Sequence, residues 1–385
     1  MQRVRKLEGE MTLEVIEKMC YNLLEWFEQN NYTGHDPYQF PQSIIPSSIF
    51  FKHFPSPSLV FAFLPRLLIP EALGLIIRAN VSFCKALGSS FLIRKNRMLI
   101  KTLLDYLEAS RYSAWGVPFK WKSGFGLKYP KDYPFAIVSA GIGHSLLDQY
   151  TITKEKRLLA TSERIAEFLL NKNGFLKMGK KICFYYSNLD KYLVHNVNVY
   201  TASFLIRLGY LKGLDRYFEI ARKAIDFTIN QQNTDGSWYY YAYPFSKYVS
   251  TIDNRHTGYT LVSLKWSNAY LESERIQSSI NWGWHFYKNN FILNGRVPKY
   301  RIDKTFPIDI HDAAQAILTS LEMGEPQTAL TLAKWVIMNM SNEKNEFYFK
   351  MYKNGRVVRM SFIRWSQAWM YRALTFLLEK AASID

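Results

Sequence analysis

The sequence predicts an all-α protein, a closed ring of six helical hairpins called an (α/α)6 toroid, with short β-hairpins at one rim. Two observations predict it: apolar residues recur at helical spacing along most of the 385 residues, and successive helices alternate between two kinds of surface. The helical patterns cover twelve segments: 13–29, 68–87, 95–111, 134–150, 155–171, 194–208, 215–231, 256–272, 274–289, 311–323, 326–340 and 362–380.

The alternation separates outer helices from inner ones. One set has a charged face, as in "SERIAEFLLNK", whereas the other carries small and apolar residues on most sides, as in "AIVSAGIGHSLLDQY". A helix that is apolar nearly all round belongs in the interior. We therefore expect one toroid domain over residues 1–385, with the apolar, proline-interrupted segment 41–66 as an insertion.

The connections between helices also repeat. Asn-Gly or Asp-Gly stands near β-forming, aromatic-rich runs after several outer helices, which is typical of hairpins. His195, His256, His311 and Trp365 then open successive inner helices at intervals of 61, 55 and 54 residues. If the inner helices run parallel around an axis, their N-terminal ends meet at one rim. Their polar side chains would then form one cup with a positive potential that favours anions.

The composition limits which binding partners and which cellular location we expect. The formal net charge of +17 points to an anionic partner: nucleic acid, anionic lipid headgroups or an acidic polysaccharide. No block of Lys and Arg occurs, so we predict no nucleic acid. No run of about 18 clean apolar residues could span a membrane, although peripheral membrane contact stays open. The three cysteines form no CxxC pair, and the first residues lack an apolar signal core. We expect a cytoplasmic protein, with attachment at the inner membrane face as an alternative.

The candidate catalytic residues are His256, Asp253, His311, His195 and Tyr241. Histidine titrates near neutrality and serves as a general acid or base. Asp253 stands three residues before His256, where it could cap the helix or orient the imidazole. Tyr241 belongs to the aromatic run "WYYYAY", half of which would face the cup in an extended strand.

Other polar and aromatic residues at the helix starts are candidate substrate-binding residues. Amides suit sugar hydroxyls, arginine suits carboxylates, and tryptophan could stack on a sugar face, although aspartates in a first turn are often only caps. The candidates are Asn196, Asn198, Arg255, Trp238, Asp309, Asp312, Gln315, Arg364, Trp365, Gln367, His35 and Asp36.

Motifs for metals and nucleotides are missing from the sequence. There is no HExxH, CxxC or EF-hand spacing, and no Walker loop or GxGxxG. We predict no cofactor and no metal, and leave an ion held by the rim histidines and aspartates as the weaker alternative.

Five motifs carry a resemblance to a family. "NNYTGHDPY", "HNVN", "IDNRHTGYTL", "IDIHDAAQAI" and "RWSQAWM" resemble, in this order, the exopolysaccharide-biosynthesis proteins of bacterial and archaeal surface-glycan gene clusters. The resemblance implies an (α/α)6 toroid similar to six-hairpin glycosidases, uronate-polymer lyases and sugar epimerases. It also implies an oligo- or polysaccharide substrate, acidic or lipid-linked.

A second resemblance rests on a single motif. "QNTDGSW" resembles the QW motif of terpene-cyclase toroids, but it occurs once and no DxDD or DDxxD accompanies it. We interpret it as a shared way of turning out of an outer helix.

Two classes of function follow. The first is a carbohydrate-active enzyme of surface-polysaccharide biosynthesis: a lyase, a hydrolase or an epimerase. His256 or a tyrosine would take a proton beside a carboxylate, while His195, Asn198 and Arg364 stabilise the anion; hydrolysis would instead need two carboxylates ~5 to ~9.5 Å apart. The alternative is a non-catalytic glycan-binding or assembly subunit at the membrane surface.

Overall fold

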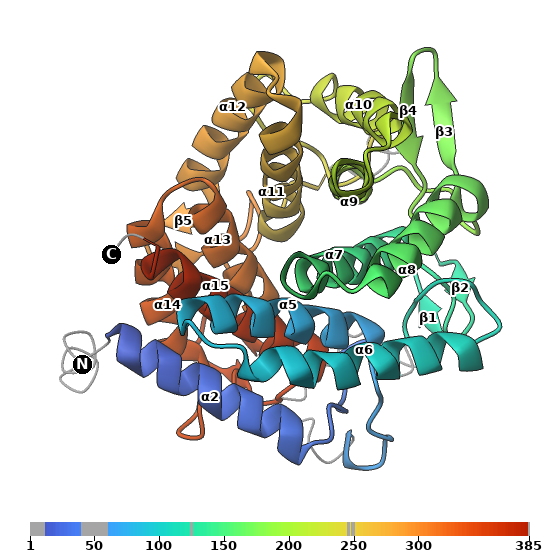
Figure 1. Cartoon of the computed structure of the whole chain (residues 1–385). Helices are drawn as coiled ribbons and strands as arrows, with labels where there is room; N and C mark the ends of the chain where they lie inside the picture. The colour runs from blue at the N-terminus through green and yellow to red at the C-terminus, as the bar shows by residue number, and fades with distance from the viewer. Residues whose placement is uncertain (1–11, 40–60, 124–125, 245–246, 248–250, 384–385) are drawn as a thin grey trace.

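A computed structural model describes residues 12–39, 61–123, 126–244, 247 and 251–383. Twelve α-helices lie within these ranges and form a closed double ring (Figure 1). The predicted (α/α)6 toroid is confirmed, and the helices agree with their predicted segments to within about four residues, except the last, which begins at Trp369 and not at 362. Most of the predicted insertion over 41–66 lies outside the described residues.

Inner and outer helices alternate strictly along the chain. The inner helices are α5 (Pro70–Ala86), α7 (Ala136–Thr153), α9 (His195–Lys212), α11 (Asn254–Leu271), α13 (Ile310–Glu322) and α15 (Trp369–Ala381). The outer helices are α2 (Leu13–Gln29), α6 (Phe91–Ala109), α8 (Lys156–Glu167), α10 (Asp215–Ile229), α12 (Glu274–Phe291) and α14 (Pro326–Met340). Two π-helical turns extend them: η1 (Phe168–Asn173) follows α8, and η3 (Ile363–Ala368) leads into α15.

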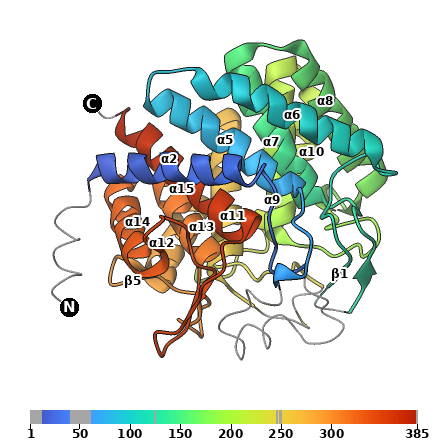
Figure 2. The same cartoon turned by 90° about the horizontal axis from the view of Figure 1, so that it is seen from below.

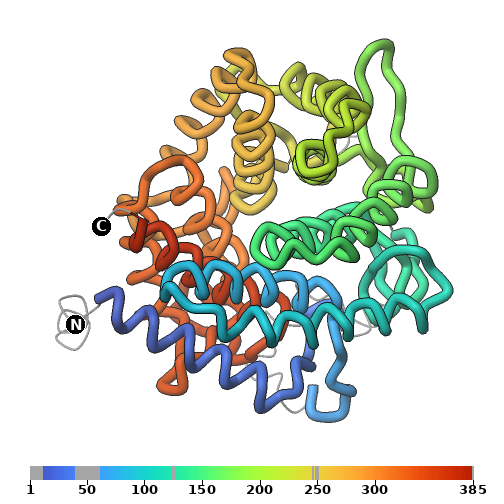
Figure 3. The backbone as a smooth tube through the Cα atoms, viewed as in Figure 1, coloured from blue at the N-terminus to red at the C-terminus, as the bar shows by residue number. Residues whose placement is uncertain are grey.

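The ring closes through helices from distant parts of the chain. Each inner helix packs against the next, and α15 packs against α5 (Figure 3). The outer helices α6, α8, α10, α12 and α14 each cover the inner helix that precedes them, whereas α2 covers α15. The sixth helical pair therefore joins the first described helix to the last.

Close packing explains why the inner helices carry small residues. On α9, 14 of the 18 residues are buried. On α7, a Cβ at Gly143 would lie 2.4 Å from the ring of Phe204 on α9, so only glycine allows these two helices to approach so closely.

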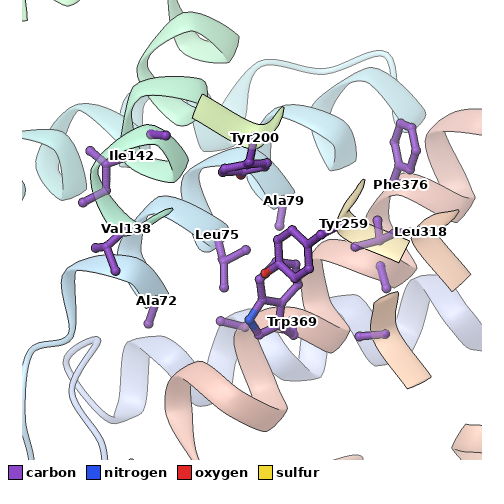
Figure 4. Packing of buried hydrophobic residues seen from close by; sticks show 14 of the residues in the cluster. Ala72, Leu75, Ala79, Val138, Ile142, Tyr200, Tyr259, Leu318, Trp369 and Phe376 are labelled. Atoms are coloured by element: carbon purple, nitrogen blue, oxygen red, sulfur yellow. The ribbon is translucent and has the colours of Figure 1, made fainter. Parts of the chain in front are cut away.

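Aromatic rings fill the middle of the ring. Tyr200 of α9 lies 5.7 Å from Tyr259 of α11, and Tyr259 lies 5.5 Å from Trp369 of α15, between ring centroids (Figure 4). These edge contacts are the geometry that aromatic pairs prefer. They form a floor, and the cavity described below lies on one side of it.

The strands are short, and the predicted Asn-Gly turns after α12 and α14 form hairpins. Asn294-Gly295 joins β5 (Ile292–Leu293) to β6 (Val297–Pro298), and Asn354-Gly355 joins β8 (Lys350–Met351) to β9 (Val357–Val358). The other strands are β1 (Trp121–Lys122), β2 (Lys128–Tyr129), β3 (Phe175–Met178), β4 (Lys181–Phe184) and β7 (Ile308–Asp309), which pairs with β8.

Two predicted turns differ from the structure. Gly174 precedes β3, and the turn between β3 and β4 is made at Gly179, whose φ is +60°. The aromatic run after Gly236 forms no hairpin of its own, because Ala242 donates its N–H to Leu193 O and Tyr240 donates to Thr251 O. The run therefore lies against the start of α9. Figure 2 shows such connections, with β1 and β5, along one side of the ring.

No helix in the described ranges is long and apolar enough to cross a membrane.

Candidate active site

A cavity of about 300 Å³ opens where the inner helices begin. All six inner helices contribute, and in each case the second residue of the helical segment lines the cavity, counting η3 as the start of the last one. These residues are Glu71, Ile137, Asn196, Arg255, His311 and Arg364. Six helix N-termini thus point their partial positive charge towards one space.

The side wall is aromatic and comes from the connecting segments. Trp121 stacks on Tyr129 with centroids 5.1 Å apart and planes 15° apart. Other rings that line the cavity are Tyr38, Phe119, Phe135, Tyr186, Tyr192, Tyr240 and Tyr241. Flat apolar faces edged with hydroxyl groups suit the alternating C–H and O–H surfaces of a sugar.

His256 and Asp253 form a hydrogen-bonded pair at the start of α11. One oxygen of Asp253 accepts the His256 backbone N–H at 3.0 Å and caps the helix, while the other lies 2.7 Å from His256 Nδ1. A carboxylate only accepts, so Nδ1 donates to it, and in the neutral imidazole Nε2 then keeps its lone pair. Nε2 has no hydrogen-bond partner among the described residues, and the imidazole is 25% exposed.

The charge of Asp253 is stabilised by its neighbours. Burial acts to raise its pKa, but the charge that His256 carries when protonated, the hydrogen bonds from His256 and the charge of Arg255 outweigh burial and lower it. Asp253 is therefore a carboxylate near neutral pH. The pair has the arrangement of a general base with an orienting acid.

His311 lies deeper in the cavity wall. Its ring stacks on Trp369 at 4.3 Å, meets Trp365 edge-on at 4.8 Å, and its Nε2 lies 3.4 Å from the Tyr259 hydroxyl. Burial and the positive charges of Arg255 and Arg364 hold its pKa well below the usual range. His311 is thus a neutral hydrogen-bonding group.

Arg364 is hydrogen-bonded to two carboxylates. Its Nε and Nη2 donate to the two oxygens of Asp36 at 2.6 and 3.0 Å, and its Nη1 donates to Glu71 at 2.7 Å. Asp36 is completely buried, whereas Glu71 reaches the cavity. This bidentate cluster ties η3 to α5 and to the segment after α2. Sequence analysis missed Glu71, although a Glu after the first-turn Pro70 is typical of a helix start.

Arg255, unlike Arg364, is not held by hydrogen bonds to carboxylates. It makes no hydrogen bond to any described residue, stacks over Trp365 at 4.8 Å, and has its nearest carboxyl oxygen 3.6 Å away on Asp312. Asp312 is buried, and burial raises its pKa well above the usual value, with the nearby Asp309 and Asp253 acting in the same direction. At this separation Asp312 accepts no hydrogen bond from Arg255, so the guanidinium donors stay unused at the cavity.

Asp309 supports the site from behind. It accepts the His311 backbone N–H at 3.0 Å and the Trp365 indole N–H at 2.9 Å, and it pairs with Lys350 at 3.3 Å. It therefore fixes the position of Trp365, which lines the cavity, and caps α13.

Several predicted site residues do not line this cavity, because their polar groups bond within the protein. Asn198 accepts the Phe184 N–H at 3.0 Å and donates to Ala224 O at 2.7 Å. Gln367 bonds the N–H and C=O of Phe347 at 3.1 and 2.8 Å.

Four more predicted residues also lie outside it. Trp238 donates to Thr228 O at 3.1 Å, and Gln315 donates to Thr319 at 3.1 Å. The ring of His35 packs on Phe61. His195 lies 3.3 Å from Thr228 Oγ1, and burial lowers its pKa to about 3. It adjoins His256 only through a small side pocket.

The predicted site residues that share the main cavity are His256, His311, Tyr241, Asn196, Arg255, Arg364 and Trp365, with Asp253, Asp36 and Asp309 as their direct partners. The tyrosines at 129, 186 and 192 were missed, because no local signal ties those segments to the helix starts. Among the described residues, no three His, Cys, Asp or Glu side chains form a group that could hold a metal ion.

The ring of paired helices with its cavity at the inner-helix starts places the chain among the (α/α)6 toroids of the six-hairpin glycosidase fold. It is similar to the cellobiose 2-epimerase of Bacillus thermoamylovorans, with TM-score 0.63, 10% identity, and coverage of 82% of this chain and 88% of that one. It is also similar to a family 76 glycoside hydrolase (mannosidase) of Bacteroides thetaiotaomicron, with TM-score 0.59, 12% identity, and 82% and 88% coverage.

A third similar structure is an unsaturated glucuronyl hydrolase of Bacillus sp. GL1, with TM-score 0.56, 12% identity, and 79% and 84% coverage. At these identities the likeness is one of fold. No protein-family model matches the chain, and no curated protein matches it in sequence.

Proposed function

We propose that the protein is a carbohydrate-active enzyme that moves a proton at a carbon atom of an acidic sugar residue, as an epimerase or a lyase, with His256 as the general base. The observation that carries the proposal is the His256–Asp253 pair: Asp253 holds Nδ1, and His256 lines a cavity walled by aromatic rings. The fold shared with sugar epimerases and glycoside hydrolases supports it.

Proton transfer fits the cavity better than hydrolysis by two carboxylates. Among the described residues, Glu71 is the one carboxylate that lines the cavity, and its charge is paired with Arg364. The usual hydrolytic mechanism needs a second carboxyl group across the scissile bond. His256, by contrast, lines the cavity and is already oriented by Asp253.

The reaction would begin when Nε2 of His256 takes the proton from the carbon beside the sugar carboxylate. The electron pair moves onto the carboxylate, and a positive group next to those oxygens lowers the barrier. In epimerisation the carbon regains a proton on its other face. In elimination the electron pair returns to form a C=C bond while the neighbouring C–O bond breaks and the leaving oxygen gains a proton.

Arg255 is the group proposed to face the sugar carboxylate. It is the cavity arginine with unused hydrogen-bond donors, and its guanidinium is held flat by Trp365. The net charge of +17 favours an acidic polymer in the same way. The motif resemblance leads us to place this substrate in surface-polysaccharide biosynthesis, as a free or lipid-linked glycan.

The test is hydrogen exchange at carbon in D2O, with uronate-containing and neutral oligosaccharides, followed by mass spectrometry. We expect deuterium incorporation or a gain of unsaturation with uronates, lost in His256→Gln while binding remains. His285→Gln, on the exposed face of α12, is the matched control and should behave as the wild type. A gain of water without exchange would indicate a hydrolase instead, and binding without any product would indicate a non-catalytic glycan-binding subunit.

Arg255→Gln tests the substrate class. Losing a charge-assisted hydrogen bond costs about 1.5–3 kcal/mol, so uronate binding should weaken roughly 10- to 150-fold. Binding of a neutral oligosaccharide of the same length should change little. Equal losses for both sugars would contradict the role given to Arg255.

A further inference from the structure

A second cavity, of about 360 Å³, shares no lining residue with the first. Its walls come from the segment after α6, the loop before α7 and the π-helical turn η1, and include Arg111, Tyr112, Tyr133, Phe168, Lys172 and Asn173. We propose that this cavity is a second binding site for an anionic segment of a glycan chain. The choice of a glycan rests on the proposed function, whereas the site itself does not.

The charge of the cavity is positive and uncompensated. Arg111 and Lys172 are both exposed, neither forms an ion pair with a described residue, and no carboxylate lines the cavity. Arg111 donates to the Tyr112 hydroxyl at 2.8 Å and its guanidinium lies 4.9 Å from that ring, while Lys172 donates to Ser113 at 3.1 Å. Neutral partners thus hold both cations in place without cancelling their charge, which suits an anion.

The rest of the wall suits a sugar ring. Tyr112 meets Tyr133 edge-on at 5.5 Å, and the Tyr133 backbone is fixed against Gly116, where a Cβ would lie 1.8 Å from its carbonyl oxygen. Asn173 is buried and donates to Tyr185 O at 2.8 Å, yet its own amide oxygen has no partner among the described residues. A buried acceptor without a donor is costly, so the wall at Asn173 carries an unsatisfied polar group.

These features favour a glycan over a lipid surface. None of the lining residues is among the exposed large apolar side chains of the described chain, so the cavity offers nothing to insert into a bilayer. Fixed tyrosines, an amide and two cations around a cavity instead match a sugar residue that carries a carboxylate.

One aromatic loop separates this site from the candidate active site. Tyr133 contacts Tyr129 at 5.9 Å and Phe135 at 6.2 Å between centroids, and both of those rings line the first cavity. An acidic chain engaged at both sites would be held more tightly than at either alone, because the second contact is then intramolecular.

The test is hydrogen–deuterium exchange of the full chain with a hexamer of galacturonic acid, against maltohexaose as the neutral probe. We expect slower amide exchange in peptides that cover residues 110–113 and 168–173 with the hexauronate only. In Arg111→Gln/Lys172→Gln this protection should disappear and the affinity measured there should fall roughly tenfold. The matched control Arg222→Gln/Lys223→Gln removes two exposed charges from α10 and should keep the protection.

The contrary outcomes are separate from those of the proposed function. Protection confined to the inner-helix starts, no protection at all, or equal loss in the control variant would overturn the second site. Protection by phosphatidylglycerol vesicles without protection by the hexauronate would show a lipid surface and would also overturn it. If His256→Gln loses turnover but keeps the protection at 110–113 and 168–173, both the proposed function and the second site are supported. If the wild type is inactive but shows that protection, only the second site is supported.

Discussion

Asp253→Asn is the sharpest perturbation that the structure offers. The asparagine oxygen can still accept the His256 backbone N–H, so the cap of α11 survives. Its NH2 group, however, replaces the oxygen 2.7 Å from His256 Nδ1 and must donate there. His256 then carries its proton on Nε2 and cannot act as a base from the cavity side.

The expected effect on rate is much larger than the effect on stability. General base catalysis contributes about 10²- to 10⁴-fold, so carbon–hydrogen exchange should slow by at least about 100-fold. Because the cap remains, the free energy of unfolding should fall by about 1 kcal/mol, which for a chain of this length lowers Tm by about 2 °C.

The assay combines the exchange rate in D2O with a thermal melt of the same sample. Asp253→Asn/His256→Gln should be no slower than His256→Gln alone, because both substitutions remove the same general base. Exchange in Asp253→Asn at more than half the wild-type rate would refute the assignment of the base. So would a drop in Tm of about 10 °C, because Asp253 would then act mainly in folding.

Three further predictions concern stability. Arg364→Met leaves two carboxylates without their partner and should cost about 3–5 kcal/mol, seen as a Tm at least about 6 °C lower, whereas an unchanged Tm would contradict the ion-pair cluster. Gly143→Ala should lower the free energy of unfolding in urea by about 1–3 kcal/mol, because its Cβ clashes with Phe204. Gly141→Ala, whose Cβ would have its nearest contact at 3.6 Å, should raise that free energy by up to about 1 kcal/mol. The reverse order would contradict the packing. His195 has a pKa of about 3, below that of the unfolded chain, so the unfolded state binds a proton first on acidification. The contribution of neutral His195 to the free energy of unfolding is fully present above about pH 6.5. It falls by about 1.4 kcal/mol per pH unit as the pH decreases from there towards about 3. His195→Gln should flatten that slope, and an unchanged slope would rule the histidine out.

The helices could be predicted because their pattern is local. The alternation of amphipathic and nearly uniform helices predicts two layers, and α11 begins at Asn254, two residues before the predicted start. The polar starts of α9, α11 and α13 could be recognised for the same reason. Once the ring was assumed, the meeting of His256, His311 and Arg364 at one cavity followed from helix direction alone.

The individual roles at the site depend on contacts that no local pattern encodes. Asn198 looks like a sugar-binding amide, but its oxygen accepts a hydrogen bond from β4 and its NH2 group donates to α10. Arg364 looks like a carboxylate clamp for substrate, but Asp36, 328 residues away, already occupies it. Arg255 has the same charge and no such partner, a difference that only the folded chain reveals.

The pairing of α2 with α15 has a consequence for how the protein comes apart. An open stack of helical hairpins loses its terminal repeats first, because each of these has a neighbour on one side only. Here every inner helix has two neighbours, and the first and last helices cover one another. We expect the ring to resist fraying and to melt as a single cooperative unit, with the cavity at the inner-helix starts intact until the whole structure is lost.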